Sequence, residues 1–185
     1  MHVAFVAYDG MTALDFVGAF DPVTRLSTMD YMEMTWDVCA RTETVTAGAD
    51  LRFEADAVGN PLDGYDLVFV PGGFATRELR RDEAFVSWLR SAGDADLLAS
   101  VCTGSLLLGA AGFLDGVPAT THPSAYDDLA EYCEVRGDRV VDAGDVVTAR
   151  GVSSSLDLGL YLVERLADET TRREIAAQMD YERDD

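Results

Sequence analysis

The sequence predicts a single α/β domain in which helices cover both faces of a mostly parallel sheet. Short apolar runs typical of strands alternate along the chain with longer segments of helical periodicity. No linker, repeat or change of composition divides the 185 residues, of which 48% are hydrophobic. This length suits one well-buried core and is too small for two. We therefore expect one domain over residues 1–185, built as a three-layer sandwich.

Strands are expected at the short apolar runs. The first is predicted over residues 2–8, followed by a turn at Asp9-Gly10. The weak alternation over 42–53 favours a small hairpin, and another hairpin is expected around Ala143-Gly144. The remaining strands are predicted at 34–40, 66–70, 97–101, 139–142 and 145–148.

Helices are expected where apolar residues recur every three or four positions. In the first of them, over 12–29, Pro22 is the residue at which a disturbance is expected. The second helix is predicted over 82–91, and Asp82 is a suitable N-cap for it. Four more helices are predicted, over 104–111, 126–132, 153–166 and 169–180.

Cys102 lies where a buried strand turns directly into a helix. The residues before it are apolar or small, and Gly104 allows the following helix to pack closely. A nucleophile at such a strand–helix turn is exposed at the sheet edge, and the helix N-terminus lowers the pKa of a thiol. We therefore predict that Cys102 is a reactive cysteine with the lowest thiol pKa in the chain, in preference to a small thiol packed in the core.

Three segments that follow strands are expected to meet at one edge of the sheet. They are 8–15, 71–74 and Cys102, and ligands of parallel α/β sheets bind at the carboxyl ends of the strands. Cys39 and Cys133 are interpreted as structural thiols. Three cysteines without a Cys-x-x-Cys pair predict neither a disulfide framework nor a zinc site, and we expect no metal.

Acidic residues dominate the charge. Asp and Glu number 34 against 14 basic residues, all of them arginine, giving a net charge of −20. An acidic surface without lysine suits a protein in concentrated salt, where self-repulsion is screened, and we predict a halophilic source. The same surface argues against nucleic acid as a partner. The cluster of Arg77, Arg80 and Arg81 is interpreted as a solvated helix face.

The chain enters its first strand without a charged leader or cleavage site, and no apolar run approaches the length of a membrane span. We therefore expect a cytoplasmic protein with no membrane partner.

Five motifs together resemble the ThiJ/PfpI superfamily, whose fold is similar to that of class I glutamine amidotransferases. The resemblance covers nearly the whole chain and implies a flavodoxin-like sandwich. Within the superfamily, the Asp15 context and the Cys-Thr-Gly turn are similar to isocyanide hydratases and to the amidotransferase-like domain of AraC-type regulators. The motifs are Ala13-Leu14-Asp15-Phe16-Val17-Gly18, Val70-Pro71-Gly72-Gly73-Phe74, Ser100-Val101-Cys102-Thr103-Gly104, the segment 114–122 and the segment 150–158.

The resemblance implies that Cys102 is the nucleophile and that Asp15 faces its sulfur and exchanges its proton. An acid beside a thiolate is held protonated by repulsion and burial, although Asp15 is also placed to serve only as a charge at a helix N-terminus. Backbone N–H groups of Gly72, Gly73 and Thr103 are expected to bind a developing anion or the substrate, and the glycines must also form a tight turn.

His122 is interpreted either as a structural histidine or as a peripheral site residue. Pro123 follows it where the hydratases usually show an aromatic residue. Peptidases of the superfamily place histidine directly after the nucleophile, and Thr103 at that position argues against a peptidase.

The resemblance implies a hydratase that adds water to an isocyanide and gives an N-substituted formamide. It implies a small-molecule substrate, no cofactor and a homodimer. Two alternatives stay open. One is another cysteine reaction on the same scaffold, such as glyoxal hydration or hydrolysis, and the other is a ligand- or redox-sensing domain without enzyme activity.

Overall fold

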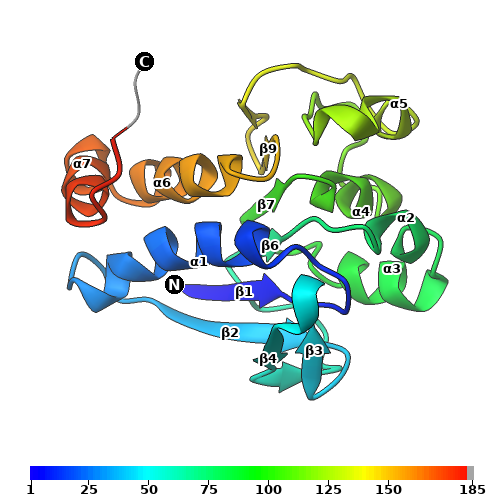
Figure 1. Ribbon diagram of the computed structural model, residues 1–185, viewed down its shortest axis with the longest axis horizontal. Coiled ribbons are helices and arrows are strands. Elements are labelled where there is room, and N and C mark those ends of the chain that lie inside the picture. Colours follow the sequence, from blue (N-terminus) through cyan, green and yellow to red (C-terminus); the bar gives the residue numbers. More distant parts are fainter. Residues whose placement is uncertain (183–185) are drawn as a thin grey trace.

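The chain forms a seven-stranded sheet in a computed structural model that describes residues 1–182 (Figure 1). The strand order is β5-β2-β1-β6-β7-β9-β8, and all neighbours are parallel except the hairpin β8–β9. The strands are β1 (His2–Val6), β2 (Thr35–Ala40), β5 (Ala57–Val58), β6 (Leu67–Val70), β7 (Leu97–Val101), β8 (Val140–Asp142) and β9 (Val146–Ala149).

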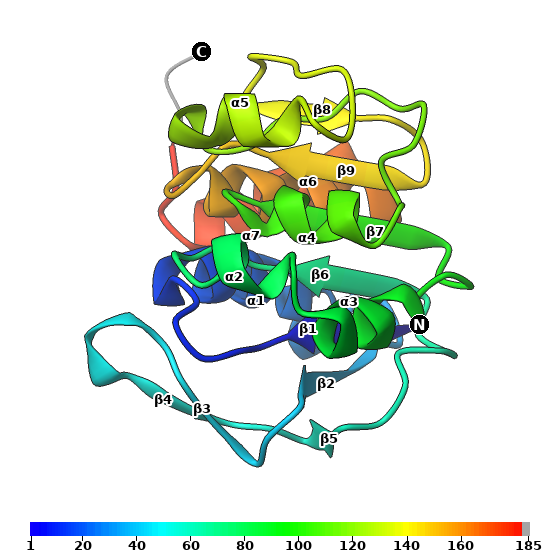
Figure 2. The ribbon, with the colours of Figure 1, turned by 90° about the vertical axis from the view of Figure 1, so that its right-hand side faces the viewer.

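Helices cover both faces of this sheet (Figure 2). On one face lie α1 (Ala13–Thr28), α6 (Ser154–Leu166) and α7 (Glu169–Gln178), and on the other α2 (Thr76–Leu79), α3 (Glu83–Arg90) and α4 (Gly104–Ala110). The short α5 (Tyr126–Leu129) packs beside α4. The predicted three-layer α/β sandwich is confirmed.

Glycines bring α1 and α6 into close contact, and α1 carries Asp15. A Cβ atom built on Gly18 would lie 2.1 Å from Ser155 Oγ, and one on Gly159 would lie 2.9 Å from Pro22 Cγ. The α1 helix runs from residue 13 to 28 with Pro22 inside it, so the expected disturbance does not end the helix. In addition, Ser155 Oγ donates to the Leu14 carbonyl at 3.1 Å, which ties the first turn of α1 to α6.

Most predicted elements are confirmed, with differences at short ones. The hairpin over 42–53 is present as β3 (Thr44–Thr46) and β4 (Arg52–Glu54), with a 3₁₀ turn η1 (Gly48–Asp50) between them. Asp82 caps α3 by accepting from the N–H groups of Ala84 and Phe85. The elements β5 and α2 were not expected, because two and four residues are too few to show a periodicity.

The arginine cluster is not a solvated helix face, and that interpretation is wrong for Arg80. Its side chain is only 5% exposed, because it pairs with Asp128 at 2.8 Å and Glu131 at 3.5 Å and so ties α2 to the α5 region. Arg81 is exposed, whereas Arg77 is half-buried. Within residues 1–182, no helix combines the length and the apolar character needed to cross a membrane.

Candidate active site

Cys102 occupies a strained turn between β7 and α4. Its φ of 55° lies in the left-handed region, which residues with a side chain rarely adopt. Two hydrogen bonds hold the turn: Cys102 N–H donates to the Ala149 carbonyl at 3.0 Å, and Thr121 Oγ1 donates to the Cys102 carbonyl at 2.8 Å. A Cβ atom on Gly104 would lie 2.4 Å from the Val70 carbonyl oxygen, so α4 can start here only with glycine.

The three loops predicted to meet at the sheet edge do meet. Thr12 N–H donates to the Gly72 carbonyl at 2.8 Å, which joins the first loop to the second. The Tyr8 hydroxyl donates to the Pro71 carbonyl at 2.6 Å. Gly73 N–H donates to Thr103 Oγ1 at 3.0 Å and so joins the second loop to the nucleophile turn.

Gly72 lies between Asp15 and Cys102 and leaves just enough room for both. A Cβ atom at residue 72 would be 2.8 Å from Asp15 Oδ2, 2.7 Å from Cys102 Cβ and 2.6 Å from the Thr103 nitrogen. The space that a side chain at residue 72 would need is therefore bordered by the Asp15 carboxyl, the Cys102 side chain and the Thr103 nitrogen. These groups were expected at one site, and in the structure they lie around Gly72.

The Asp15 carboxyl is completely buried, and neither oxygen has a hydrogen-bond partner of normal geometry among the described residues. Burial raises the pKa of this carboxyl to about 7, an effect opposed in part by the nearby Cys102 thiol and Gly72 N–H. A carboxyl that titrates near neutral pH can both accept and donate a proton there.

The expectation of a low thiol pKa at Cys102 is wrong. Burial, together with the negative charge of Asp15, raises the pKa of this thiol to about 12, although the N–H and hydroxyl of Thr103 act in the opposite direction. Burial also raises the pKa of Cys39, to about 11. The sequence argument for a low pKa counted only the helix terminus. It left out the burial of the thiol and the charge of Asp15, although the family resemblance had already placed Asp15 beside the sulfur.

The glycine N–H groups are largely engaged within the protein. Gly73 N–H already bonds Thr103 Oγ1, and that hydroxyl returns a hydrogen bond to the Gly73 carbonyl at 3.0 Å. Gly72 N–H lies toward the Asp15 carboxyl. The N–H groups of Gly72 and Gly73 are therefore not available to bind a developing anion, contrary to what was expected. The N–H of Thr103, which lies beside the sulfur, stays the predicted donor to that anion.

A cavity of about 110 Å³ opens beside the nucleophile. Cys102 and Thr103 form part of its wall, and Asp15 is not one of its lining residues. The carboxyl lies next to this wall, at Gly72 and the Cys102 side chain. The other lining residues are Thr12, Gly73, Phe74, Arg77, His122, Ser124 and Val152.

His122 lines this cavity and also caps the short 3₁₀ turn η2 (Pro123–Ala125). Its Nδ1 accepts from Ser124 N–H at 3.2 Å and lies 2.8 Å from Ser124 Oγ. Among the described residues it makes no hydrogen bond to Cys102, so there is no Cys–His pair. The structure thus unites the two interpretations, because His122 is both a structural cap and a peripheral cavity residue.

Gly151 and Val152 belong to the site although sequence reasoning gave them no role. A Cβ atom on Gly151 would lie 2.5 Å from Cys102 Sγ, so this glycine makes room for the sulfur. Val152 lines the cavity. The signal that pointed to them was the motif over 150–158, which follows the end of β9 at the same sheet edge.

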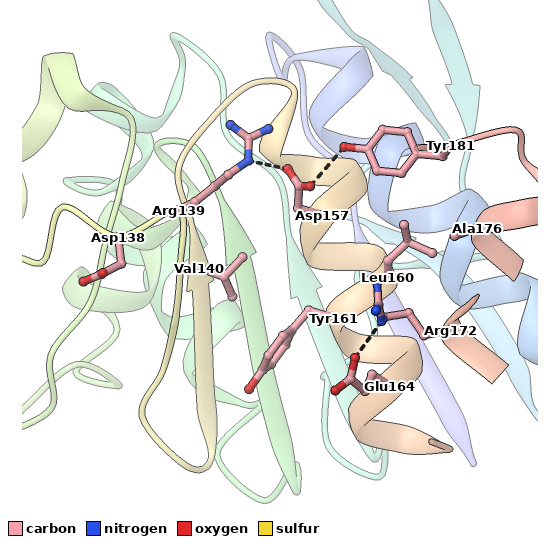
Figure 3. A pocket seen from close by; sticks show the side chains of 10 residues that line it. All are labelled: Asp138, Arg139, Val140, Asp157, Leu160, Tyr161, Glu164, Arg172, Ala176 and Tyr181. Carbon is pink, nitrogen blue, oxygen red and sulfur yellow. Dashed lines mark hydrogen bonds and ion pairs between the residues drawn. The ribbon is translucent and has the colours of Figure 1, made fainter. Parts of the chain in front are cut away.

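A larger cavity of about 530 Å³ lies away from the nucleophile, beside α6, α7 and β8 (Figure 3). Most of its charged groups are paired: Asp157 with Arg139 at 2.5 Å and with the Tyr181 hydroxyl at 3.0 Å, and Glu164 with Arg172 at 2.7 Å. Neither Asp15 nor Cys102 contributes to it. Within residues 1–182 no three His, Cys, Asp or Glu side chains gather in a way that could hold a metal ion.

The chain has relatives among known proteins. The model of the DJ-1/PfpI family matches residues 1–165. The chain belongs to the DJ-1/PfpI family. One member similar to it is the isonitrile hydratase of Pseudomonas putida, which is 31% identical over 183 residues, covering 98% of this chain and 78% of the hydratase.

Two further proteins are similar to this chain. A crystal structure of a ThiJ/PfpI family protein from Pseudomonas syringae superposes with a TM-score of 0.87 at 32% identity, covering 100% of this chain and 76% of that protein. The transcriptional regulator CdhR of Pseudomonas aeruginosa is 32% identical over 165 residues, which are 86% of this chain and 48% of the regulator.

Proposed function

We propose that this DJ-1/PfpI protein is a cysteine-dependent hydratase that adds water to an isocyanide and gives an N-substituted formamide. The observation that carries the proposal is a buried acid of pKa about 7 packed against a thiol that faces a small cavity. The similarity to an isonitrile hydratase over 98% of the chain supports it, isonitrile being another word for isocyanide.

The first half of the proposed reaction is an addition to the terminal isocyanide carbon. The Asp15 carboxylate takes the Cys102 thiol proton as Sγ forms a bond to this carbon. A thiol of high pKa needs such a base at neutral pH. Asp15 then donates the proton to the same carbon, which gives a thioimidate, R–N=CH–S.

Water completes the reaction. Asp15 again acts as a base and removes a proton from the water that attacks the thioimidate carbon, and this proton ends on the nitrogen. The C–S bond then breaks, the hydroxyl proton returns to the sulfur, and R–NH–CHO is released. One water is consumed, no electrons are transferred, and no cofactor is called for in this scheme.

Substitution of the two reacting residues tests the proposal. Cys102→Ala and Asp15→Asn are each expected to lower formamide production at least ~10²-fold, because they remove the nucleophile and the exchangeable proton. Cys133→Ala is the matched control, because this half-buried thiol lies outside the cavity. Wild-type protein that converts no isocyanide from a panel of small alkyl and aryl compounds would contradict the hydratase assignment.

A second candidate function is sensing by the same cysteine, favoured by the similarity to CdhR over 86% of this chain. A sensor would show no turnover, while oxidation of Cys102 would change its shape or its binding to a partner protein. Intact-mass analysis and light scattering after mild peroxide treatment separate this outcome from hydration.

We also propose that the protein forms a homodimer through α1. Leu14 and Val17 expose 48% and 43% of their surface on the helix that carries Asp15, and such exposed apolar side chains are suited to an interface. The halophilic source and the cytoplasmic location stay predictions from the sequence.

A further inference from the structure

Arg77 lines the same cavity as Cys102. It lies on α2, directly after the loop 71–74 that packs against the nucleophile turn. Its guanidinium carbon is 5.8 Å from the centre of the Phe74 ring. Stacking on an aromatic face leaves the N–H groups at the edge of a guanidinium available for another partner.

No carboxylate pairs with Arg77 among the described residues, although the chain has 34 acidic residues and a net charge of −20. The neighbouring Arg80 shows the contrast, because two acidic side chains hold it. The wall of the cavity contains no Asp or Glu. Arg52, Arg81, Arg90 and Arg150 also form no ion pair among the described residues, but they lie outside this cavity, whereas Arg77 shares its wall with Cys102. A ligand bound there can supply the negative charge that Arg77 lacks.

His122 adds a second donor to this wall. Because its Nδ1 accepts from Ser124 N–H, a neutral ring carries its hydrogen on Nε2, which then acts as a donor. The hydroxyls of Thr12 and Ser124 complete a lining that can donate hydrogen bonds and holds no fixed negative charge.

The cavity also limits the size of the ligand. Its volume of about 110 Å³ is small compared with the ~300–1,000 Å³ of sites for drug-sized ligands. Phe74, which is 88% exposed, forms part of the wall, so a short ligand that reaches from Cys102 to Arg77 fits this site better than a bulky one.

We propose that Arg77 is a specificity residue that binds an anionic group of the substrate, so that the preferred substrates are short isocyanides bearing a carboxylate. This inference rests on the proposed hydratase function for the isocyanide group and on the cavity alone for the anion. A guanidinium binds a carboxylate through two parallel charge-assisted hydrogen bonds.

The test compares isocyanoacetate with its neutral methyl ester. Binding of each is measured by calorimetric titration of Cys102→Ala protein, which cannot turn the ligand over. We expect the acid to bind roughly tenfold more tightly than the ester at ~0.1 M salt, and Arg77→Gln to abolish that preference. The matched control is Arg81→Gln, an exposed neighbour outside the cavity that should keep the preference.

The two proposals fail in different ways. Equal binding of acid and ester, binding of neither, or an unchanged preference in Arg77→Gln would overturn the anion assignment, even if the wild type hydrates both compounds. A preference that depends on Arg77, together with wild-type protein that hydrates neither compound, would uphold the anion site and overturn the hydratase. Circular dichroism of Arg77→Gln confirms that a lost preference is not a lost fold.

Discussion

Replacing Asp15 by asparagine should stabilise the protein at alkaline pH and much less in acid. The folded carboxyl has a pKa of about 7 instead of 3.8, so the folded state holds this proton more tightly than the unfolded state. The resulting stability is complete below pH ~4 and is lost as the pH rises through 7. A pKa difference of one unit corresponds to ~1.4 kcal/mol, so the change from 3.8 to about 7 lowers the free energy of unfolding by at most about 4 kcal/mol at high pH. Asparagine keeps the size of the side chain and cannot ionise.

Urea unfolding at pH 5 and pH 8.5 measures this effect. The difference in unfolding free energy between Asp15→Asn and wild type should grow with pH, reaching up to about 4 kcal/mol at pH 8.5. Repulsion within the acidic chain also varies with pH, but it affects both proteins alike. Asp94→Asn, at an exposed acid, removes one negative charge as a control. If the difference in unfolding free energy between Asp15→Asn and wild type is the same at both pH values, the argument that burial raises the pKa of Asp15 is refuted.

The remaining predictions concern the thiol, the glycine and the assembly. Alkylation of Cys102 by iodoacetamide, followed by peptide mass mapping, should keep rising up to pH 10 without a plateau, and Asp15→Asn should accelerate it at pH 9 because a negative charge beside the sulfur is removed. Gly72→Ala should lower turnover by ~10²-fold or more, since its methyl group would displace the reacting side chains, whereas Gly137→Ala, with open space around it, should not. Light scattering should give the mass of a dimer, and a monomeric mass would contradict the proposed α1 interface.

The fold could be predicted because its signals are local. Alternating apolar runs and helical periodicity identified the long strands and helices, and the rule for parallel sheets placed three separate loops at one edge. That rule needs only the chain order of the elements. It therefore predicted that the segment 8–15 would reach the same edge as Cys102, whereas the closer statement that Asp15 faces the sulfur came from the family resemblance.

The electrostatic state of the site could not be predicted from the same signals. The thiol pKa depends on how deeply Cys102 is buried and on which charge lies beside it, and both are properties of the packed structure. The arginine cluster shows the same limit. Three arginines within five residues have three environments: Arg77 at the cavity, Arg80 buried between acids and Arg81 in solvent.

Two unfavourable features of this fold occur at the same place. Cys102 has a backbone conformation that costs on the order of 1–3 kcal/mol, and Asp15 is buried without a normal hydrogen-bond partner. Both would be relieved by small substitutions, so stability alone gives no reason for them. The strained turn directs the sulfur toward the cavity, and burial keeps the carboxyl titrating near neutral pH. The surrounding glycines allow this arrangement, since a Cβ atom at either Gly72 or Gly151 would collide with the Cys102 side chain. We propose that the two features together serve the proposed hydration, in which the turn presents the sulfur to the cavity and the buried carboxyl exchanges protons, because stability alone gives no reason for either.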